Sequence, residues 1–210
     1  MEMTMQKLDL KKEYLSYYKA GKDPQLVNLN EGKFLSLSGI GAPEGALFQK
    51  SIETIYPVAY TIKKYYKHLE KDFVVPKLEC FWWVESDVPF AETPRKEWFW
   101  ELLIQMPEYV DTGKVDEAIS EVIKKKNILL ANEVYLKKIN EGQVVQMMHI
   151  GSYEEEQVTI ENIFEYMALK NLEINGHHHE IYISDPRKTP QEKLQTIIRY
   201  AVKSIDKTSQ

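Results

Sequence analysis

A run of three histidines followed by a glutamate is the first part of the chain whose residue types could do chemistry. It lies in the segment HHHEIYISDPRKTP, residues 177–190. On an extended strand His177 and His179 point to one face and His178 to the other. A zinc site needs a third or fourth donor, and only two of the five histidines lie elsewhere, without a Cys-x-x-Cys or His-Glu-x-x-His spacing. We therefore expect no metal site and no cofactor.

The glutamate of this segment, Glu180, is the stronger candidate. It alternates with Tyr182, while Ile181 and Ile183 face the other side of the expected strand. If the isoleucines lie under the helices, Glu180 faces whatever lies across the sheet. On the solvent face of an antiparallel sheet, a glutamate is ordinary. In a cleft, a carboxylate is costly unless it is paired, and it would then act as a cation receptor or general base. Both interpretations are open at this point.

All four tryptophans gather on two expected strands, in the segments KLECFWWVE and EWFWELLIQM. Aromatic residues on both faces of such a pair exceed the needs of a single core, so we expect one face to line a pocket. A flat aromatic wall beside a carboxylate suits planar, often cationic ligands. Simple core packing is the alternative interpretation. The candidate ligand contacts are Trp82, Trp83, Trp98 and Trp100.

An internal repeat suggests how these residues are positioned. Residues 30–41 read NEGKFLSLSGIG and residues 140–151 read NEGQVVQMMHIG, at an offset of 110. ELLIQMP and EIYISDP form a second match at an offset of 79, which aligns Glu101 with Glu180. This order of matches predicts a duplicated origin. It also makes Glu101 a further candidate ligand contact.

The periodicity of each half predicts a strand, a helix, one or more strands and a trailing helix. The first helix is expected over 47–69, with Pro57 kinking or splitting it. The last is expected to begin at Pro190, with Thr189 as its cap. The predicted fold class is α+β. It is a tandem duplication of a strand-helix-strand-strand module with pseudo-twofold symmetry and a ligand groove between the halves.

The expected domain organisation is an N-terminal extension over residues 1–20 and one domain over 21–210. The two repeats of that domain span about 26–127 and 132–204.

Composition excludes several classes of function. The net charge of −5 does not fit a nucleic-acid-binding protein, which needs a basic face. The single cysteine, Cys80, excludes an intramolecular disulfide. We find no signal peptide and no stretch long and apolar enough to span a bilayer, so we expect a cytoplasmic protein without a membrane partner. The sequence assigns no oligomeric state.

Three motifs together resemble the GyrI-like small-molecule-binding domain family, in particular its stand-alone bacterial branch. They are HIGSYEEE at 149–156, WFWELLIQMP at 98–107 and HHEIYISDPRKTPQEKLQTIIR at 178–199. The resemblance extends from about Leu26 to Val202. Relatives in that family are effector domains of multidrug-binding transcription regulators. The resemblance therefore implies two related modules and an aromatic small molecule as partner.

The resemblance also implies roles for single residues. A glutamate that receives aromatic, often cationic drugs corresponds to Glu180, and Tyr153 and Tyr182 match aromatic positions of the groove. Some stand-alone members hydrolyse cyclopropane-bearing, DNA-alkylating compounds and so detoxify them. This implies a hydrolase with Glu180 and Tyr182 as catalytic residues. The alternatives are a non-catalytic drug-binding sequesterer or sensor, or a gyrase-inhibitor-like interaction protein.

Overall fold

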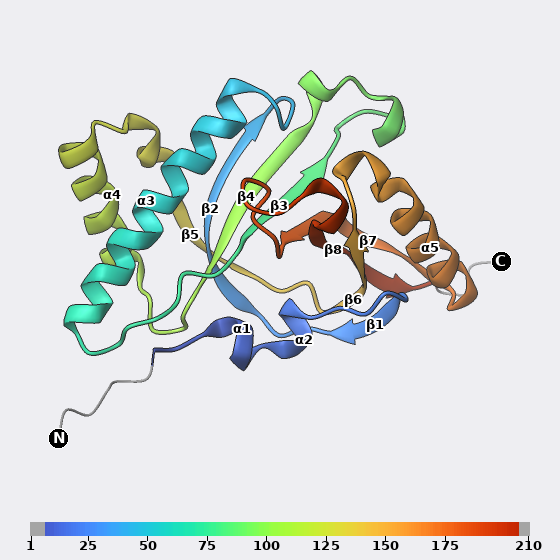
Figure 1. Ribbon diagram of the computed structural model, residues 1–210, viewed down its shortest axis with the longest axis horizontal. Coiled ribbons are helices and arrows are strands. Elements are labelled where there is room, and N and C mark those ends of the chain that lie inside the picture. Colours follow the sequence, from blue (N-terminus) through green and yellow to red (C-terminus); the bar gives the residue numbers. More distant parts are fainter. Residues whose placement is uncertain (1–6, 206–210) are drawn as a thin grey trace. The chain divides into compact units, whose positions relative to one another are not determined.

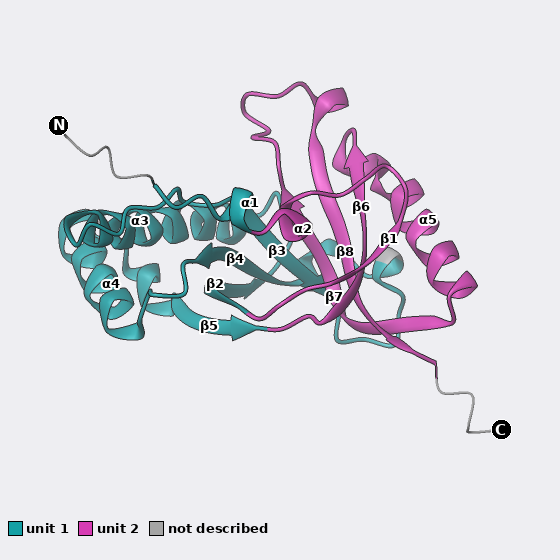
Figure 2. Ribbon diagram, turned by 90° about the horizontal axis from the view of Figure 1, so that it is seen from below, with its two compact units in different colours: residues 1–13, 32–139 teal, residues 14–31, 140–210 magenta. Residues whose placement is uncertain are grey.

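The computed structural model describes residues 7–205, and the chain divides into two compact units (Figure 2). Unit 1 comprises residues 1–13 and 32–139, and unit 2 comprises residues 14–31 and 140–210, each as far as they are described. Both units combine helices with antiparallel strands, so the α+β class is confirmed. The expected extension over residues 1–20 is shared between the units, and its first six residues lie outside the described part.

Unit 1 is a four-stranded antiparallel sheet covered by helices. Its strands are β2 (Gly32–Ile40), β3 (Leu78–Trp83), β4 (Phe99–Met106) and β5 (Tyr135–Ile139), in the order β3-β4-β2-β5. Its helices are α1 (Leu10–Glu13), α3 (Ala46–His68) and α4 (Thr112–Lys126). Helix α3 packs against β2 and β4, and α4 packs against α3 (Figure 1). Three short 3-10 turns, Phe90–Glu92, Arg95–Glu97 and Leu129–Glu133, complete the unit.

Helix α3 was predicted over nearly the same residues and continues through Pro57, so the predicted split does not occur, while the predicted kink stays a prediction. A proline inside a helix leaves a carbonyl in the preceding turn without its usual N–H donor. The proline's own carbonyl accepts a hydrogen bond of 2.8 Å from the hydroxyl of Thr61. The buried face of the helix runs on both sides of the proline, so packing holds the helix together there. This face includes Phe48, Ile55, Val58, Ala59 and Ile62.

Unit 2 has the same order of elements around its own four-stranded antiparallel sheet. Its strands are β1 (Gln25–Asn28), β6 (Gln143–Ile150), β7 (Leu172–Tyr182) and β8 (Gln195–Ser204), in the order β1-β6-β8-β7. Its helices are α2 (Leu15–Tyr18) and α5 (Glu156–Leu169), with 3-10 turns at Tyr153–Glu155 and Gln191–Lys193. Helix α5 covers one sheet face, where Val145, Met147, Ile163, Met167 and Ile198 form a buried core. Strand β1 pairs with β6, so residues 25–28 belong to this unit although they precede β2 in the chain.

The expected C-terminal helix is wrong, because residues 195–204 form strand β8. Only a 3-10 turn, Gln191–Lys193, follows Pro190. Strand β8 is central in its unit, and most of its residues are buried on both faces. A strand buried on both faces has a continuous apolar run rather than an alternating one, and such a run is easily mistaken for a buried helix. Its β-branched and aromatic residues, which favour strands, are Thr196, Ile197, Ile198, Tyr200 and Val202.

The expected match of Glu101 with Glu180 is also wrong. The strand orders make β7 the counterpart of β3, and β8 the counterpart of β4. With β2 aligned on β6 as in the first repeat match, three rows of paired residues run across each sheet. In unit 1 they are Leu35–Ile104–Leu78, Leu37–Leu102–Cys80 and Gly39–Trp100–Trp82. In unit 2 they are Val145–Tyr200–His178, Met147–Ile198–Glu180 and His149–Thr196–Tyr182. The counterpart of Glu180 is therefore Cys80.

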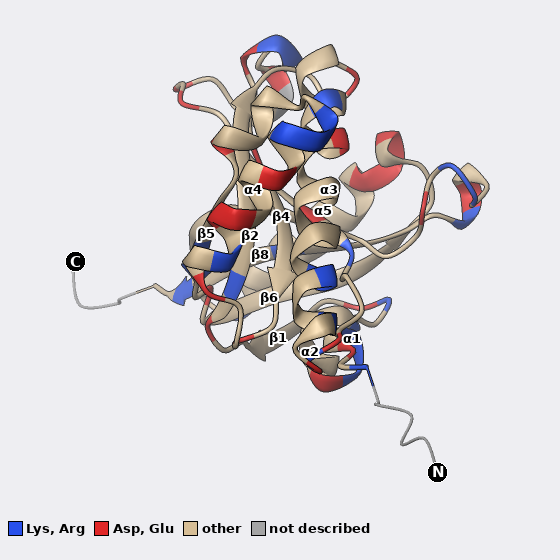
Figure 3. Cartoon of the chain, turned by 90° about the vertical axis from the view of Figure 1, so that its left-hand side faces the viewer, with Lys and Arg blue, Asp and Glu red and all other residues tan. Residues whose placement is uncertain are grey.

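Charged residues of both signs are interspersed along the helices and loops rather than gathered in one basic band (Figure 3). Within residues 7–205, no helix combines the length and apolarity needed to cross a membrane.

Candidate functional site

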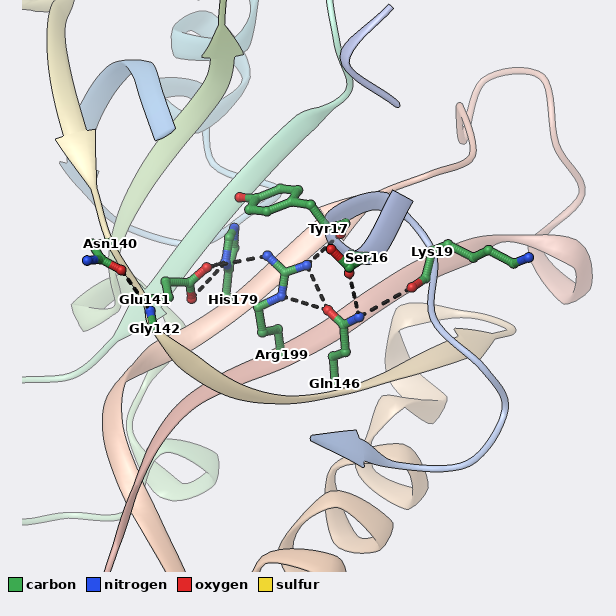
Figure 4. A network of polar contacts seen from close by, with 9 residues as sticks. All are labelled: Ser16, Tyr17, Lys19, Asn140, Glu141, Gly142, Gln146, His179 and Arg199. Carbon is green, nitrogen blue, oxygen red and sulfur yellow. Dashed lines mark hydrogen bonds and ion pairs between the residues drawn. The ribbon is translucent and has the colours of Figure 1, made fainter. Parts of the chain in front are cut away.

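The histidine run is divided between two faces of β7 and therefore between two environments. The side chain of His179 is only 1% exposed, and its Nδ1 lies 3.1 Å from Oε2 of Glu141. The same carboxylate oxygen lies 3.3 Å from Nη1 of Arg199. Arg199 also donates to Oε1 of Gln146 and to the backbone carbonyl of Tyr17. Figure 4 shows that this network joins β8, β7 and β6 to α2 and to Lys19 directly after it.

The buried network around Arg199 is fully paired and holds unit 2 together. Burial alone would raise the pKa of Glu141, but the charges and hydrogen bonds of His179 and Arg199 outweigh it and lower this pKa to about 2. Gln146 donates to the backbone carbonyls of Ser16 and Lys19 at 2.9 and 3.3 Å. These contacts fasten residues 14–31 to the sheet, and we assign them a structural role.

His178, Glu180 and Tyr182 lie on the opposite face of β7, where Glu180 pairs across the strands with Ile198. Ile198 belongs to the core that α5 covers. The expectation that Ile181 faces the helix and Glu180 the far side is therefore reversed. Ile181 is fully buried on the face that carries His179, while Glu180 is half-buried beside α5. Side-chain alternation was predicted correctly, but the identity of the covered face was not.

Glu180 lies at one end of a hydrogen-bonded chain that also contains His178 and Tyr200. Nε2 of His178 lies 2.9 Å from Oε1 of Glu180. Nδ1 of the same ring lies 2.6 Å from the hydroxyl of Tyr200 on the neighbouring strand β8. A register shift in β7 between Ile174 and His178 brings His178 opposite Tyr200. Such bulges redirect side chains next to functional sites.

Helix α5 adds a second carboxylate, Glu156, to this group. A capping box between Ser152 and Glu155 starts the 3-10 turn that leads into the helix, and Glu156 is the first helical residue. Ligand atoms of Glu156, His178 and Glu180 all lie within 4.8 Å of one another. Glu156 is only 7% exposed, and its Oε1 is buried without a hydrogen-bond partner among the described residues.

Burial and the neighbouring carboxylates set the protonation of these groups. Burial raises the pKa of Glu156 far above its ordinary value, and the charge of Glu180 and a hydrogen bond to it act in the same direction. Two carboxylates this close do not both ionise readily. Glu156 is therefore a neutral carboxylic acid at pH 7.

Aromatic rings surround the carboxylates of unit 2. The Tyr153 ring meets that of Tyr182 edge to face, with ring centroids 6.0 Å apart. Phe164 on α5 packs against Tyr200 at 5.2 Å. Burial, followed by the charges of Glu180, Glu156 and Asp185, raises the pKa of Tyr153 to about 12, so its hydroxyl keeps its proton as a donor. The side chains of Tyr153 and Phe164 are about two-fifths exposed and accessible to a ligand.

The donor set of Glu156, His178 and Glu180 has the composition of a divalent-cation site. One ring nitrogen of His178 contacts Glu180 and the other contacts Tyr200. The expectation that no metal binds here stays a prediction. Within the described residues, these side chains form a hydrogen-bonded cluster. It offers a neutral acid and a second carboxylate within reach of one bound molecule.

The tryptophans lie in unit 1, and two of them are packed in its core. Trp82 and Trp100 are 4% and 0% exposed. Phe48 of α3 stacks on Trp82 at 5.0 Å and meets Trp100 edge to face at 5.2 Å. These two rings leave little surface for a ligand, which agrees with the alternative interpretation of simple core packing.

Trp83 and Trp98 are half-buried in unit 1. Trp83 stacks on Phe99 at 5.6 Å. Trp98 packs against Phe90 at 4.2 Å and donates through Nε1 to the carbonyl of Thr93. These contacts order the loop between β3 and β4. A ligand-binding role for Trp83 and Trp98 stays a prediction.

Glu101, in unit 1, has partners of a different kind from those of Glu180. It accepts hydrogen bonds from the hydroxyls of Ser36 and Tyr135 and forms an ion pair with Lys137 at 2.8 Å. Its pairing places it in the row Ser38–Glu101–Phe81, which corresponds to Met148–Ile197–Ile181 in unit 2. A carboxylate neutralised by an adjacent lysine is a poor receptor for a cation. Its role as a ligand contact is a prediction that these contacts do not favour.

Glu156 and Tyr200 were missed as site residues. Glu156 ends a run of three glutamates, a pattern that usually marks a solvated surface. Tyr200 lies in the segment that was assigned to a helix. The capping pattern Ser152-x-x-Glu155 was the available signal, because it fixes where α5 begins and therefore which glutamate faces the sheet.

Comparisons with known proteins agree with this architecture. A model of the GyrI-like small molecule binding domain matches residues 22–203. A crystal structure of an uncharacterized conserved protein from Listeria innocua is 36% identical, with a TM-score of 0.88, and covers 94% of this chain and 100% of that chain. A crystal structure of a hydrolase from the same organism is 34% identical, with a TM-score of 0.84 and the same coverage.

A more distant likeness supports the fold alone. The C-terminal domain of EcmrR is 14% identical, with a TM-score of 0.56, and covers 87% of this chain and 98% of that chain. Among curated proteins, no match is found.

Proposed function

The chain belongs to the family of GyrI-like small molecule binding domains, and from that membership we propose that it binds and hydrolyses a planar aromatic, electrophilic molecule at the polar cluster of unit 2. The observation that carries the proposal is the pair of close carboxyls, Glu156 and Glu180, beside His178 and exposed aromatic rings. The crystal structure named as a hydrolase, at 34% identity, supports a hydrolytic reaction.

Glu180 is the base in this proposal. It accepts a hydrogen bond from His178, which orients one of its oxygens. A carboxylate in this position takes a proton from water as the water oxygen attacks carbon, and such general-base assistance contributes about 10²–10⁴-fold. Exposed rings such as Tyr153 and Phe164 hold a planar ligand over the carboxylate.

Glu156, as a neutral acid, supplies the proton that the substrate takes up. The substrate class follows from the family resemblance: a cyclopropane conjugated to a dienone. A carbon–oxygen bond forms from water, the strained carbon–carbon bond breaks, and its electron pair moves onto the carbonyl oxygen. That oxygen takes the proton of Glu156, with the hydroxyl of Tyr182 as an additional hydrogen-bond donor. The hydrogen bond between the two carboxyls then returns the proton from Glu180 to Glu156, which closes the cycle.

A product-resolved assay tests this proposal. We expect wild type to convert a cyclopropane-bearing alkylating compound to its ring-opened alcohol, and Glu180→Gln to lose about 100-fold or more in rate. Glu161→Gln is the matched control, because Glu161 lies on α5 as Glu156 does, and its side chain accepts a hydrogen bond from Gln157 one turn away. It should retain wild-type activity. Full activity of Glu180→Gln would exclude it as the base.

Non-catalytic binding is the second candidate function, and one observation favours it. The buried Oε1 of Glu156 lacks a hydrogen-bond partner among the described residues, and a ligand N–H or O–H would satisfy it at a gain of about 1–3 kcal/mol. Binding without turnover predicts that the alkylating compound is recovered unchanged from a complex with wild type. A ring-opened product would exclude this candidate.

A further inference from the structure

The imidazole of His178 contacts a side chain at each of its nitrogens. Nε2 lies 2.9 Å from Oε1 of Glu180. In the proposed function the carboxylate of Glu180 accepts this hydrogen bond, which requires a hydrogen on Nε2. With one hydrogen on the ring, Nδ1 is an acceptor, and the hydroxyl of Tyr200, 2.6 Å away, is placed to donate to it.

We propose that Tyr200 and His178 are positioning residues for Glu180. The hydroxyl of Tyr200 donates to Nδ1, keeps the ring in its neutral Nε2–H tautomer, and so directs one uncharged N–H at the carboxylate. This inference rests on the proposed role of Glu180 as the base. It extends the machinery to two residues that act through Glu180 and need not touch the ligand.

The surroundings of Tyr200 suit a fixed donor. Its side chain is 7% exposed and packs between the rings of Phe164, at 5.2 Å, and His178, at 5.1 Å. Burial, followed by the charges of Glu180 and Glu156, raises the pKa of Tyr200, so the phenol keeps its proton. The titratable groups that face the imidazole are Glu180 on its own strand, Tyr200 on β8 and Glu156 on α5.

Control of the tautomer matters because two carboxyls lie beside this ring. If Nδ1 lost its donor, a second proton could bind there, and the neighbouring carboxylates would stabilise the resulting imidazolium. An imidazolium beside Glu180 forms an ion pair that favours the ionised carboxylate, which then takes a proton from water less readily. A neutral N–H orients the carboxylate without this loss of basicity.

The corresponding row of unit 1 shows that the fold does not require this polar pair. There the residues are Leu35, Ile104 and Leu78, where unit 2 has Val145, Tyr200 and His178. Apolar side chains fill that row in unit 1, with Ile104 fully buried. The hydroxyl and the imidazole of unit 2 therefore serve a purpose other than sheet packing.

The tautomer can be measured directly on the ligand-free full chain by long-range ¹H–¹⁵N correlation of the histidine rings at pH 7. The chain has five histidines, and the signals of His178 are identified by their absence in His178→Gln. We expect a protonated Nε2 and an unprotonated Nδ1 in wild type, and a mixture of tautomers or a doubly protonated ring in Tyr200→Phe. A wild-type ring with hydrogen on Nδ1, or an unchanged signature in Tyr200→Phe, would overturn the proposal. If Tyr200→Phe does not fold, the wild-type spectrum alone decides.

Kinetics give a second readout. Tyr200→Phe should lower kcat about tenfold and change KM by less than about twofold, because basicity and not ligand contact is affected. Tyr166→Phe loses the same hydroxyl beside the same core and should leave both constants unchanged. An unchanged kcat in Tyr200→Phe would contradict the inference. If wild type shows no turnover, the proposed reaction fails, while the ring spectrum still tests the hydrogen-bond chain.

Discussion

Corresponding positions of the two units carry larger or less polar side chains in unit 1 and side chains with polar groups in unit 2. Where unit 1 has Cys80 and Trp82 on β3, unit 2 has Glu180 and Tyr182 on β7. Where unit 1 has Trp100 on β4, unit 2 has Thr196 on β8. One sheet arrangement therefore supports two kinds of interior.

In unit 1 the space around Trp100 is filled by closely packed side chains. Trp100 lies so near Gly39 that a β-carbon on the glycine would be 2.3 Å from the indole. Phe48 covers the two rings from α3. The counterpart of Gly39 in unit 2 is His149, whose ring bonds to the side chain of Thr159 on α5 and the backbone carbonyl of Ser152. Polar contacts there take the place of the indole.

The first turns of the covering helices, α3 in unit 1 and α5 in unit 2, also differ in polarity. The buried residues of α3 and α5 recur at the same spacing: Phe48, Ser51, Ile55 and Ala59 in α3, and Glu156, Thr159, Ile163 and Met167 in α5. Phe48 therefore corresponds to Glu156, and the two side chains are 5% and 7% exposed. Unit 2 thus lacks the ring that covers unit 1 and carries a buried carboxyl instead. We propose that unit 1 supplies stability and unit 2 supplies chemistry, since functional sites commonly depart from the packing that stability favours.

The largest expected effect on stability is at Trp100 in unit 1. Trp100→Ala removes a fully buried indole, and it should lower the free energy of unfolding by about 3–5 kcal/mol. Urea denaturation followed by circular dichroism measures this. Tyr153→Phe in unit 2, at a partly exposed ring, should change the same quantity by less than ~0.5 kcal/mol. A loss of under ~1 kcal/mol for Trp100→Ala would contradict the description of unit 1 as the stabilised part.

The two carboxylates provide the next contrast. Glu101→Gln weakens hydrogen bonds from Ser36 and Tyr135 and leaves Lys137 without its ion-pair partner, so it should cost about 1–3 kcal/mol of stability. Glu180→Gln keeps the size of the side chain and an oxygen that accepts hydrogen bonds from His178 and the protonated Glu156, so its cost should stay below ~1 kcal/mol. The measurement is urea denaturation of both variants at pH 7. Equal costs would remove the distinction between a structural and a functional carboxylate.

The raised pKa of Glu156 predicts a pH dependence specific to unit 2. The unfolded carboxyl titrates near its ordinary value of 4.5, whereas the folded one stays protonated to much higher pH. The folded state then binds more protons, so stability falls as pH rises above about 4.5. Glu156→Gln should flatten this fall between about pH 5 and pH 8.

Stability curves at several pH values test this, and Glu141 serves as the internal comparison. The pKa of Glu141 is lowered to about 2. The stability that this group contributes is therefore lost only as pH falls below about 4.5, outside the range from about pH 5 to pH 8. Identical slopes for wild type and Glu156→Gln above pH 5 would show that Glu156 ionises normally.

A small effect on stability is expected at a partly exposed ring of unit 2. Phe164 is 41% exposed, so Phe164→Leu should lower the free energy of unfolding by about 1 kcal/mol. Loss of the ring should weaken binding of a planar dye about tenfold, or roughly 1.4 kcal/mol. Fluorescence titration measures the affinity, and Val158→Thr, at an exposed position of the same helix, is the control. Unchanged affinity in Phe164→Leu would place the ligand away from this ring.

Much of the architecture could be predicted from the sequence, because period-2 and period-3.6 patterns report burial on one face. The strand around Glu180 and the helix around Pro57 were both predicted. Strand β8 was not, because a strand buried on both faces has no alternation. That single error also misaligned the repeat, since without β8 the counterpart of β7 seemed to be β4.

The candidate site could be reached only in part from the sequence, and its role stays a prediction. Glu180 was selected because it is a lone carboxylate in a strand-like run and because the family resemblance assigns it a role. Glu156 and Tyr200 come from a helix start and a neighbouring strand, and only strand register and capping geometry bring them to Glu180. The aromatic composition suggested a ligand wall, yet Trp82 and Trp100 pack under Phe48. Composition alone does not distinguish a pocket wall from a core.

The central claim is that ligand chemistry belongs to Glu180 in unit 2 and not to Glu101 in unit 1. Its most direct test is a fluorescence titration of wild type, Glu101→Gln and Glu180→Gln with a rhodamine-like planar cationic dye. We predict that Glu180→Gln weakens binding at least about tenfold and that Glu101→Gln stays within about twofold of wild type. Equal weakening in both variants, or weakening in Glu101→Gln alone, would contradict the account.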